Sequence, residues 1–275
     1  MRLLALVVAG FASRGATAPD LHVKLRSRVE IYKGSADWRE ATFDESFSPT
    51  SSALILCDMW DNHWCQGAAG RVGILARKIA PVVEAARSHG ILIIHAPSDT
   101  MDYYKDTPQR RAMRSIPSVE PPVSLALTDP PIPIDDSDGG CDTVNNPIPV
   151  NYRNWTKENP TIAIAADDLI SDNGREVYSA LRFRGIKTLF IAGVHANMCI
   201  LNRGFAIRQM TNWGVRCILI RDLTDAMYNP SRRPFVSHDQ GTDLVIQHIE
   251  KYWAPTITAD DFMRAMKGPT RSGQR

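Results

Sequence analysis

The chain has 275 residues, which is long enough to bury a sizeable core and is most simply one large domain. Its charged fraction of 23% and formal net charge of +2 are ordinary for a globular protein, and no basic cluster is interleaved with aromatic residues, so we expect no nucleic-acid partner. No apolar run reaches the roughly 18 residues that a membrane-spanning helix needs, so we expect no membrane partner either.

The first 20 residues have the layout of a secretory signal peptide. Arg2 precedes an apolar run over 3–12, and the small residues ATA follow at 16–18. Pro19 is a poor residue to follow a cleavage site, and an ordinary N-terminus is the alternative. The pattern therefore predicts export to the periplasm or the medium, with a cytoplasmic protein as the alternative.

The cysteines are odd in number and lack a framework spacing. At least one thiol stays unpaired in any monomer, whichever compartment holds the protein. There is no C-x-x-C and no H-E-x-x-H segment, so no zinc site is expected. The cysteines are Cys57, Cys65, Cys141, Cys199 and Cys217.

Regular patterns begin after an N-terminal extension at 21–52. The aliphatic run ALILC at 53–57 predicts a buried strand. Residues 71–89 carry apolar side chains at helical spacing and predict a helix that Gly90 ends. ILIIH at 91–95 predicts a second buried strand.

The regular pattern lapses between residues 97 and 160. Proline pairs, the run DDSDGG and the segment NNPIP predict a long insertion with little regular structure. Such an insertion could close over a substrate as a lid or build a subunit interface.

Strand and helix patterns then alternate to the end of the domain. Fully apolar strands between helices predict an α/β protein with three layers, a Rossmann-like fold whose mostly parallel sheet has helices on both faces. The domain should span 53–255, with a C-terminal tail at 256–275. The predicted elements are strands at 161–165, 187–193 and 215–220 and helices at 174–184, 198–212 and 242–253.

Ligands of such sheets bind at the carboxyl ends of the strands, and Cys199 lies after one of them. If Asn197 caps the helix, Cys199 occupies the second helical position, where the helix dipole favours a thiolate and the backbone N–H is free to bind an oxyanion. That position predicts a nucleophile. The alternative is a buried structural cysteine.

Polar and aromatic residues follow the first predicted strand. Asp58 comes directly after it and could take the thiol proton and return it to a leaving group. Trp60, His63 and Trp64 could form the wall of a pocket for a flat substrate, or pack as core.

His95 and Asp99 have metal-binding types of side chain, but two ligands make a weak signal. A metal-dependent hydrolase that uses His63, His95 and Asp99 is therefore the last-ranked alternative.

The segments DMWDxHWC, HxPSDTMD, DDSDGGC and GVHxNMC resemble the isochorismatase-like, or cysteine hydrolase, family, which includes nicotinamidase and N-carbamoylsarcosine amidase. The resemblance runs from about residue 53 to residue 220. It implies a catalytic triad of Asp58, Lys157 and Cys199, in which Lys157 matches by its place before the strand at 161–165.

The resemblance also implies a cis peptide bond between Val194 and His195, and an oxyanion hole formed by the backbone N–H groups of His195 and Cys199. Trp60 stands where nicotinamidases usually have Gln, and HAPSDTMD does not reproduce their zinc-type site, so neither that activity nor a metal is expected. Cys199 argues against the vinyl-ether cleavage of isochorismatases proper.

The sequence thus predicts a hydrolase that needs no cofactor and cleaves a C–N bond of a small molecule (an amide, ureide or carbamoyl group) through a Cys199 thioester. Substrate contacts are expected from Trp60, His63 and Trp64, and the resemblance implies a homo-oligomer. A non-catalytic binding or scaffold protein on the same fold is the alternative.

Overall fold

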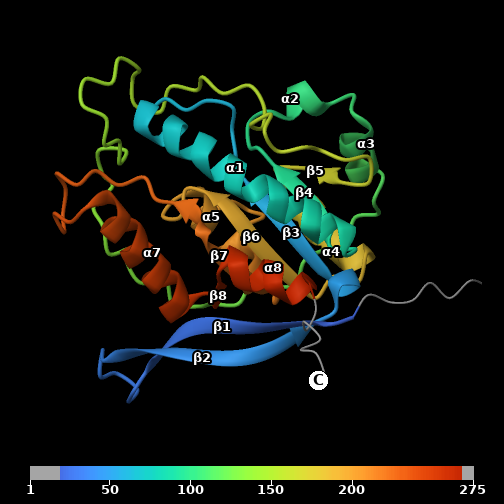
Figure 1. Cartoon of the computed structure of the whole chain (residues 1–275), viewed down its shortest axis with the longest axis horizontal. Helices are drawn as coiled ribbons and strands as arrows, with labels where there is room; N and C mark the ends of the chain where they lie inside the picture. The colour runs from blue at the N-terminus through green and yellow to red at the C-terminus, as the bar shows by residue number, and fades with distance from the viewer. Residues whose placement is uncertain (1–18, 268–275) are drawn as a thin grey trace, which may run out of the picture.

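The computed structural model of the chain describes residues 19–267, which form one eight-stranded sheet with helices on both faces (Figure 1). The strand order is β2-β1-β8-β7-β6-β3-β4-β5. The predicted three-layer α/β fold is confirmed. The six strands of the parallel part are β3 (Ser52–Cys57), β4 (Leu92–Ala96), β5 (Leu169–Ile170), β6 (Thr188–Val194), β7 (Arg216–Asp225) and β8 (Thr256–Ile257).

A hairpin of β1 (Leu21–Glu30) and β2 (Trp38–Phe47) completes the sheet, and a short 3-10 turn (Pro49–Ser51) leads from it into β3. β1 runs antiparallel to β2 and to β8. The segment at 21–52, predicted as an extension, and residues 256–267, predicted as a tail, therefore contribute to the same sheet. Their apolar side chains also join the core.

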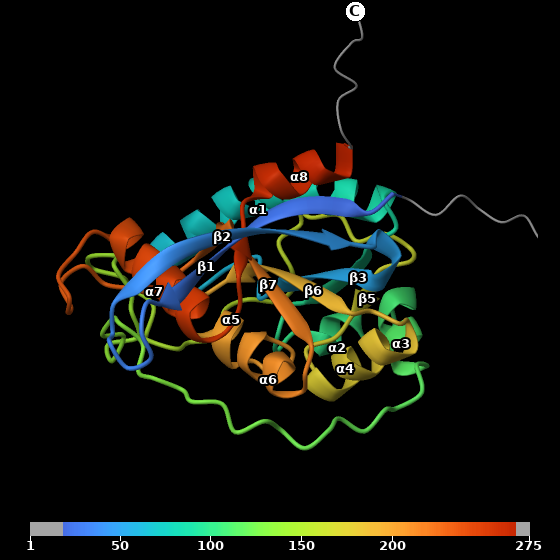
Figure 2. The same cartoon turned by 90° about the horizontal axis from the view of Figure 1, so that it is seen from below.

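Alternation along the strands creates two cores, one on each face of the sheet. Leu54 and Leu56 pack with α1 (Gln66–Ser88) and α8 (Ala259–Lys267), whereas Ile55 points to the opposite side. Figure 2 shows α1 and α8 together on one face. The opposite core contains residues of α4 (Gly174–Phe183), α5 (Cys199–Asn202), α6 (Ile207–Asn212) and α7 (His238–Tyr252).

Two predicted elements differ from the structure. The segment 161–165 is not a strand, because side chains take its backbone hydrogen bonds: Arg87 donates to Ala163 O, and Asp168 accepts from Ala165 N–H. The predicted helix at 198–212 is broken into α5 and α6. The break contains Gly204, a poor helix former that packs closely against Gly174 at the start of α4.

The insertion at 97–160 divides into three parts. Short helices α2 (Met101–Tyr104) and α3 (Pro108–Arg114) come first. Residues 117–133 then run as an extended strap along α4 and α6 (Figure 2), held by hydrogen bonds such as Leu125 N–H to Asn212 O. The first residues of the insertion, Ser98 and Asp99, lie at the carboxyl ends of the strands, and residues 134–160 return to that edge. The strap at 117–133 is therefore not a lid over it.

None of the helices within residues 19–267 combines the length and the apolar character that crossing a bilayer requires. The predicted signal peptide lies outside the described residues except for its last two positions.

The close approach of β6 to β3 requires glycine at position 193. Gly193 has φ 116, and a Cβ there would lie 2.1 Å from the carbonyl oxygen of Cys57. We expect Gly193→Ala to destabilise the protein by at least about 3 kcal/mol, because rigid backbone must move. Gly70→Ala is the matched control in α1, where a Cβ meets nothing within 4 Å. Denaturant unfolding compares the two, and equal stabilities would contradict this account.

Candidate active site

Asp58 stands at the carboxyl end of β3 and is completely buried. Its backbone has φ 49, a left-handed conformation that is uncommon for a residue with a side chain. Its Oδ1 accepts the backbone N–H of Ser98 at 2.7 Å, and its Oδ2 accepts Nε of Arg203 at 3.0 Å. The carboxylate is therefore held on two sides, and its orientation is fixed.

Cys199 lies opposite, at the start of α5 beyond the end of β6, and it is half-buried. Its thiol lies beside the Asp58 carboxylate, close enough for each group to shift the pKa of the other. The peptide bond between Val194 and His195 is cis, as predicted. The backbone N–H of His195 lies near the Cys199 sulfur and opposes the rise in its pKa. Among residues 19–267, neither this N–H nor that of Cys199 has an oxygen acceptor.

Two local expectations for Cys199 are wrong. Met198, not Asn197, is the N-cap, so Cys199 is the first helical residue. Asn197 instead bonds through its side chain to Asp136 and to the backbone of Met227. It therefore fastens the insertion and the segment after β7 to the site rather than capping α5.

The expected low thiol pKa is also wrong. Burial raises the pKa of Cys199 well above its usual value, and the neighbouring Asp58 charge raises it further. A helix of one turn has too small a dipole to oppose these effects. Burial likewise raises the pKa of Asp58, against the opposing influence of Arg203. Burial thus disfavours the ionised form of both groups, and the charge of Arg203 opposes this effect at each.

Lys157 is not joined to this pair. Its backbone bonds to Asp61 on both sides, and its Nζ lies over the ring of Tyr103, 5.4 Å from the centroid. No ion pair between Lys157 and a carboxylate occurs in the described part of the chain.

Arg203 is the cation that contacts Asp58, and it was not predicted from the sequence. Its Nη2 also approaches Oδ2 of Asp99 at 3.3 Å. Its position four residues after Cys199 would have placed both side chains on one face of the predicted helix, which is the signal that could have found it. Although burial would lower the pKa of Arg203, Asp58 raises it, so Arg203 stays charged.

The predicted substrate-contact residues belong to an aromatic cluster beside the site. Trp60 stacks on Trp155 with ring centroids 4.3 Å apart, and its Nε1 donates to Ser98 O. His63 lies between Trp155 and His195, with centroid distances of 5.8 and 5.0 Å. Trp155 comes from the insertion and was not predicted.

Burial lowers the pKa of His63 to about 4 and that of His195 to about 3, so both rings are neutral at pH 7. The cluster therefore adds no positive charge to the site.

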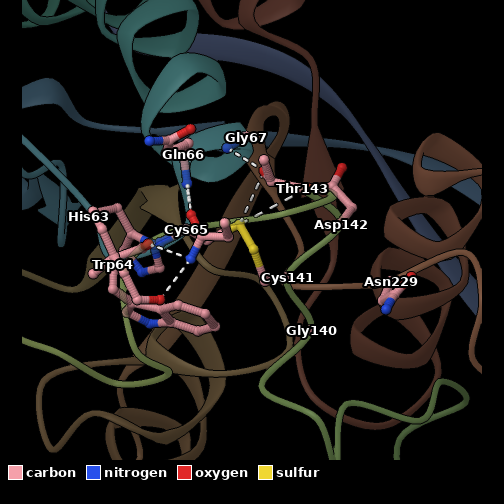
Figure 3. Close-up of a disulfide and its surroundings, with 12 residues drawn as sticks. His63, Trp64, Cys65, Gln66, Gly67, Gly140, Cys141, Asp142, Thr143 and Asn229 are labelled. Carbon is pink, nitrogen blue, oxygen red and sulfur yellow. Dashed lines mark hydrogen bonds between the residues drawn. A yellow bond between two sulfur atoms is a disulfide. The ribbon is translucent and has the colours of Figure 1, made fainter.

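Trp64 lies farther along, where the insertion is tied to the start of α1. It packs with Cys65, Ala68 and Met227. Cys65 forms a disulfide with Cys141, which Figure 3 shows beside Trp64. Next to it the backbone N–H of Gly67 donates to the hydroxyl oxygen of Thr143 at 2.7 Å. The remaining free cysteines, Cys57 and Cys217, are fully buried.

His95 and Asp99 do not converge with His63. His95 is completely buried, with Nδ1 2.6 Å from Glu158 and Nε2 3.1 Å from Asp168. Within residues 19–267, no group of three or more His, Cys, Asp or Glu side chains is arranged to hold a metal ion. The residues of the metal-dependent alternative are thus separated or already paired.

The chain matches no protein-family model and no curated protein. Solved structures do match. A cysteine hydrolase from Pseudomonas syringae pv. phaseolicola 1448A has 16% identity and a TM-score of 0.51, over 80% of this chain and 94% of that one. The chain has the isochorismatase-like α/β fold.

Two other solved structures are similar. An isochorismatase family protein from Burkholderia thailandensis has 15% identity and a TM-score of 0.46, over 79% of this chain and 96% of that one. A putative isochorismatase from Burkholderia xenovorans LB400 has 15% identity and a TM-score of 0.48, over 79% of this chain and 88% of that one.

The buried His95 makes stability depend on pH. Although burial would lower its pKa, Glu158 and Asp168 raise it to about 9. A folded-state pKa above the unfolded value of about 6.5 gives stability that is fully present below that value and is lost as pH rises through about 9. We expect a loss of about 3 kcal/mol across this window.

Urea unfolding at several pH values measures this loss, and His95→Gln is the control that should remove most of the slope. A wild-type protein whose stability is constant over the window would contradict the assignment.

Proposed function

We propose that the protein is a cysteine hydrolase of the isochorismatase-like kind, which cleaves a C–N bond in an amide, ureide or carbamoyl group of a small molecule. The observation that carries the proposal is the position of the Cys199 thiol beside the buried Asp58 carboxylate, next to the backbone N–H groups of His195 and Cys199, which have no oxygen acceptor among residues 19–267. Nucleophile, base and oxyanion donors thus occur together at the carboxyl edge of the sheet.

The reaction begins when Asp58 takes the thiol proton and the Cys199 sulfur attacks the carbonyl carbon. The oxyanion binds the N–H groups of His195 and Cys199, which is worth roughly 3 kcal/mol of barrier per donor in comparable sites. The tetrahedral intermediate then expels the amine, which takes the proton from Asp58, and a thioester is left.

Water attacks the thioester in the second half of the reaction. Asp58 accepts a proton from the water, the carbon–sulfur bond breaks, and that proton returns to sulfur. One C–N bond and one water molecule are consumed, and a carboxyl product and an amine are released.

The raised thiol pKa is compatible with this scheme. Transfer of the proton from Cys199 to Asp58 keeps the total charge of the pair unchanged, so the active site need not bind or release a proton from solvent before attack. A thiol that is protonated at rest is also less exposed to oxidation.

We further propose that Trp60, His63 and Trp64 contribute to substrate binding, with Trp155. The stacked rings of Trp60, Trp155 and His63 support a flat substrate surface next to His195. Trp64 is buried against the disulfide region, which supports a role in holding this wall rather than in direct contact.

Removal of the Cys199 sulfur should abolish turnover. We expect Cys199→Ala to reduce activity by at least about a thousandfold, because the scheme has no other nucleophile. A panel of small amides, ureides and carbamoyl compounds, assayed for ammonia or amine release, provides the measurement. Cys217→Ala is the matched control, since Cys217 is a free buried cysteine on β7.

Full activity in Cys199→Ala would rule out the scheme. If wild type turns over no compound in the panel but binds some of them, the alternative of a non-catalytic binding or scaffold protein is favoured.

We also propose that the protein is exported. The Cys65–Cys141 disulfide supports this, because disulfides persist in oxidising compartments.

The small-molecule substrate remains the proposed partner, together with further copies of the chain in a homo-oligomer, which sedimentation equilibrium would test.

The disulfide has a simple measurable consequence. Denatured but unreduced protein should expose the three thiols that are free in the structure, and reductant should bring the number to five. Ellman titration makes the count. The double variant Cys65→Ser, Cys141→Ser should lose about 2–4 kcal/mol of stability, because the loop between the two residues is no longer closed. Five thiols without reductant in protein purified from the periplasm would contradict the assignment.

A further inference from the structure

We propose that Arg203 is the positioning residue that stabilises the singly ionised Asp58–Cys199 pair, in the place that the family resemblance assigns to Lys157. The role of Arg203 in catalysis rests on the proposed function. The electrostatic effect of Arg203 on Cys199 is independent of that function, and it can be measured without a substrate.

The contacts of Arg203 are specific. Its Nε is 3.0 Å from Oδ2 of the fully buried Asp58, and its Nη2 is 3.3 Å from Oδ2 of Asp99. Its backbone N–H donates to the carbonyl oxygen of Cys199 at 3.0 Å, which ties Arg203 to the helical turn that carries the thiol. With one third of its side chain exposed, the guanidinium lies between the buried pair and solvent.

Lys157 has contacts that hold it elsewhere. The neighbouring Glu158 is buried and bound to His95, which fixes this part of the chain. The Lys157 ammonium lies over Tyr103, a residue of α2 that is itself exposed. It makes no ion pair with Asp58.

Few other groups face the Asp58–Cys199 pair from the elements packed around it. β3 contributes the buried thiol of Cys57, and the chain after β4 contributes the Ser98 N–H and, against Arg203, the Asp99 carboxylate. The chain after β6 contributes the His195 N–H. In residues 19–267, Arg203 is therefore the cation in contact with the pair.

A single guanidinium can stabilise the negative charge whether the shared proton is on Cys199 or on Asp58. It attracts the charge on Asp58 before proton transfer and the charge on sulfur afterwards, so it opposes the burial that disfavours each ion. The guanidinium of Arg203 also donates to Asp58 and Asp99 through two different nitrogens. A lysine has one side-chain nitrogen and is less well suited to bridge two carboxylates.

The experiment follows alkylation of Cys199 by iodoacetamide in the native full-length protein between about pH 7 and pH 11, because the pKa of this thiol lies above its usual value. Because Cys57 and Cys217 are fully buried and Cys65 is in the disulfide, labelling should report on Cys199, as peptide mass mapping verifies.

The variants are Arg203→Met, Arg203→Lys, and Lys157→Met as the matched control. We expect Arg203→Met to slow alkylation by at least about tenfold and to move its pH profile upward by about one unit or more, since an opposite charge is lost. Arg203→Lys keeps the charge and should stay within about fivefold of wild type. Lys157→Met should leave the profile unchanged.

The Asp99→Asn variant provides a second alkylation test, which remains valid even if Arg203→Met fails to fold. It removes a carboxylate that shares Arg203, and asparagine tolerates the left-handed backbone at this position, where φ is 64. We expect faster alkylation and a profile moved toward lower pH.

An unchanged profile in both Arg203→Met and Asp99→Asn would overturn the proposal, as would a slowing in Lys157→Met equal to that expected for Arg203→Met. Either result leaves the Cys199→Ala turnover test untouched. Conversely, a protein that hydrolyses nothing can still show the Arg203 effect, so the two failures are distinguishable.

Discussion

The site depends on the complete burial of one carboxylate, that of Asp58, at the end of a central strand. A buried charge without partners would cost several kcal/mol, so the surrounding chain must supply compensation. The Ser98 N–H and the Arg203 guanidinium do so directly. Because these bonds occupy Asp58 from two directions, they also decide how the carboxylate meets the Cys199 thiol. The same two bonds therefore compensate the buried charge of Asp58 and orient its carboxylate for the proposed chemistry.

Much of the site could be predicted from the sequence, although the sequence does not state the order of the strands directly. Apolar runs identified β3, β4 and β6, and parallel strands bring their following residues to one edge. Asp58 and Cys199 could therefore be paired before any coordinates. The cis bond between Val194 and His195 came from the family resemblance rather than from any periodicity, and the structure contains it.

What could not be predicted depends on tertiary burial. The first turn of a helix favours a thiolate, but α5 is one turn long and its half-buried cysteine lies beside a carboxylate, so the pKa moves the other way. Similarly, the pattern at 161–165 is that of a strand, but Arg87 and Asp168 bond its backbone at the edge of the sheet. In both cases a partner distant in sequence overrides a local preference.

The position of Lys157 follows from a second buried charge, that of Glu158. The ion pair of Glu158 with His95, and the bond from its N–H to the hydroxyl oxygen of Tyr104, fix the chain at this point. Trp155, three residues earlier, can then stack on Trp60. With Glu158 directed inward, its neighbour Lys157 extends along the surface of α2. The same anchor that builds the aromatic wall thus removes the lysine from the Asp58–Cys199 pair, and the cation must come from the chain that carries the thiol.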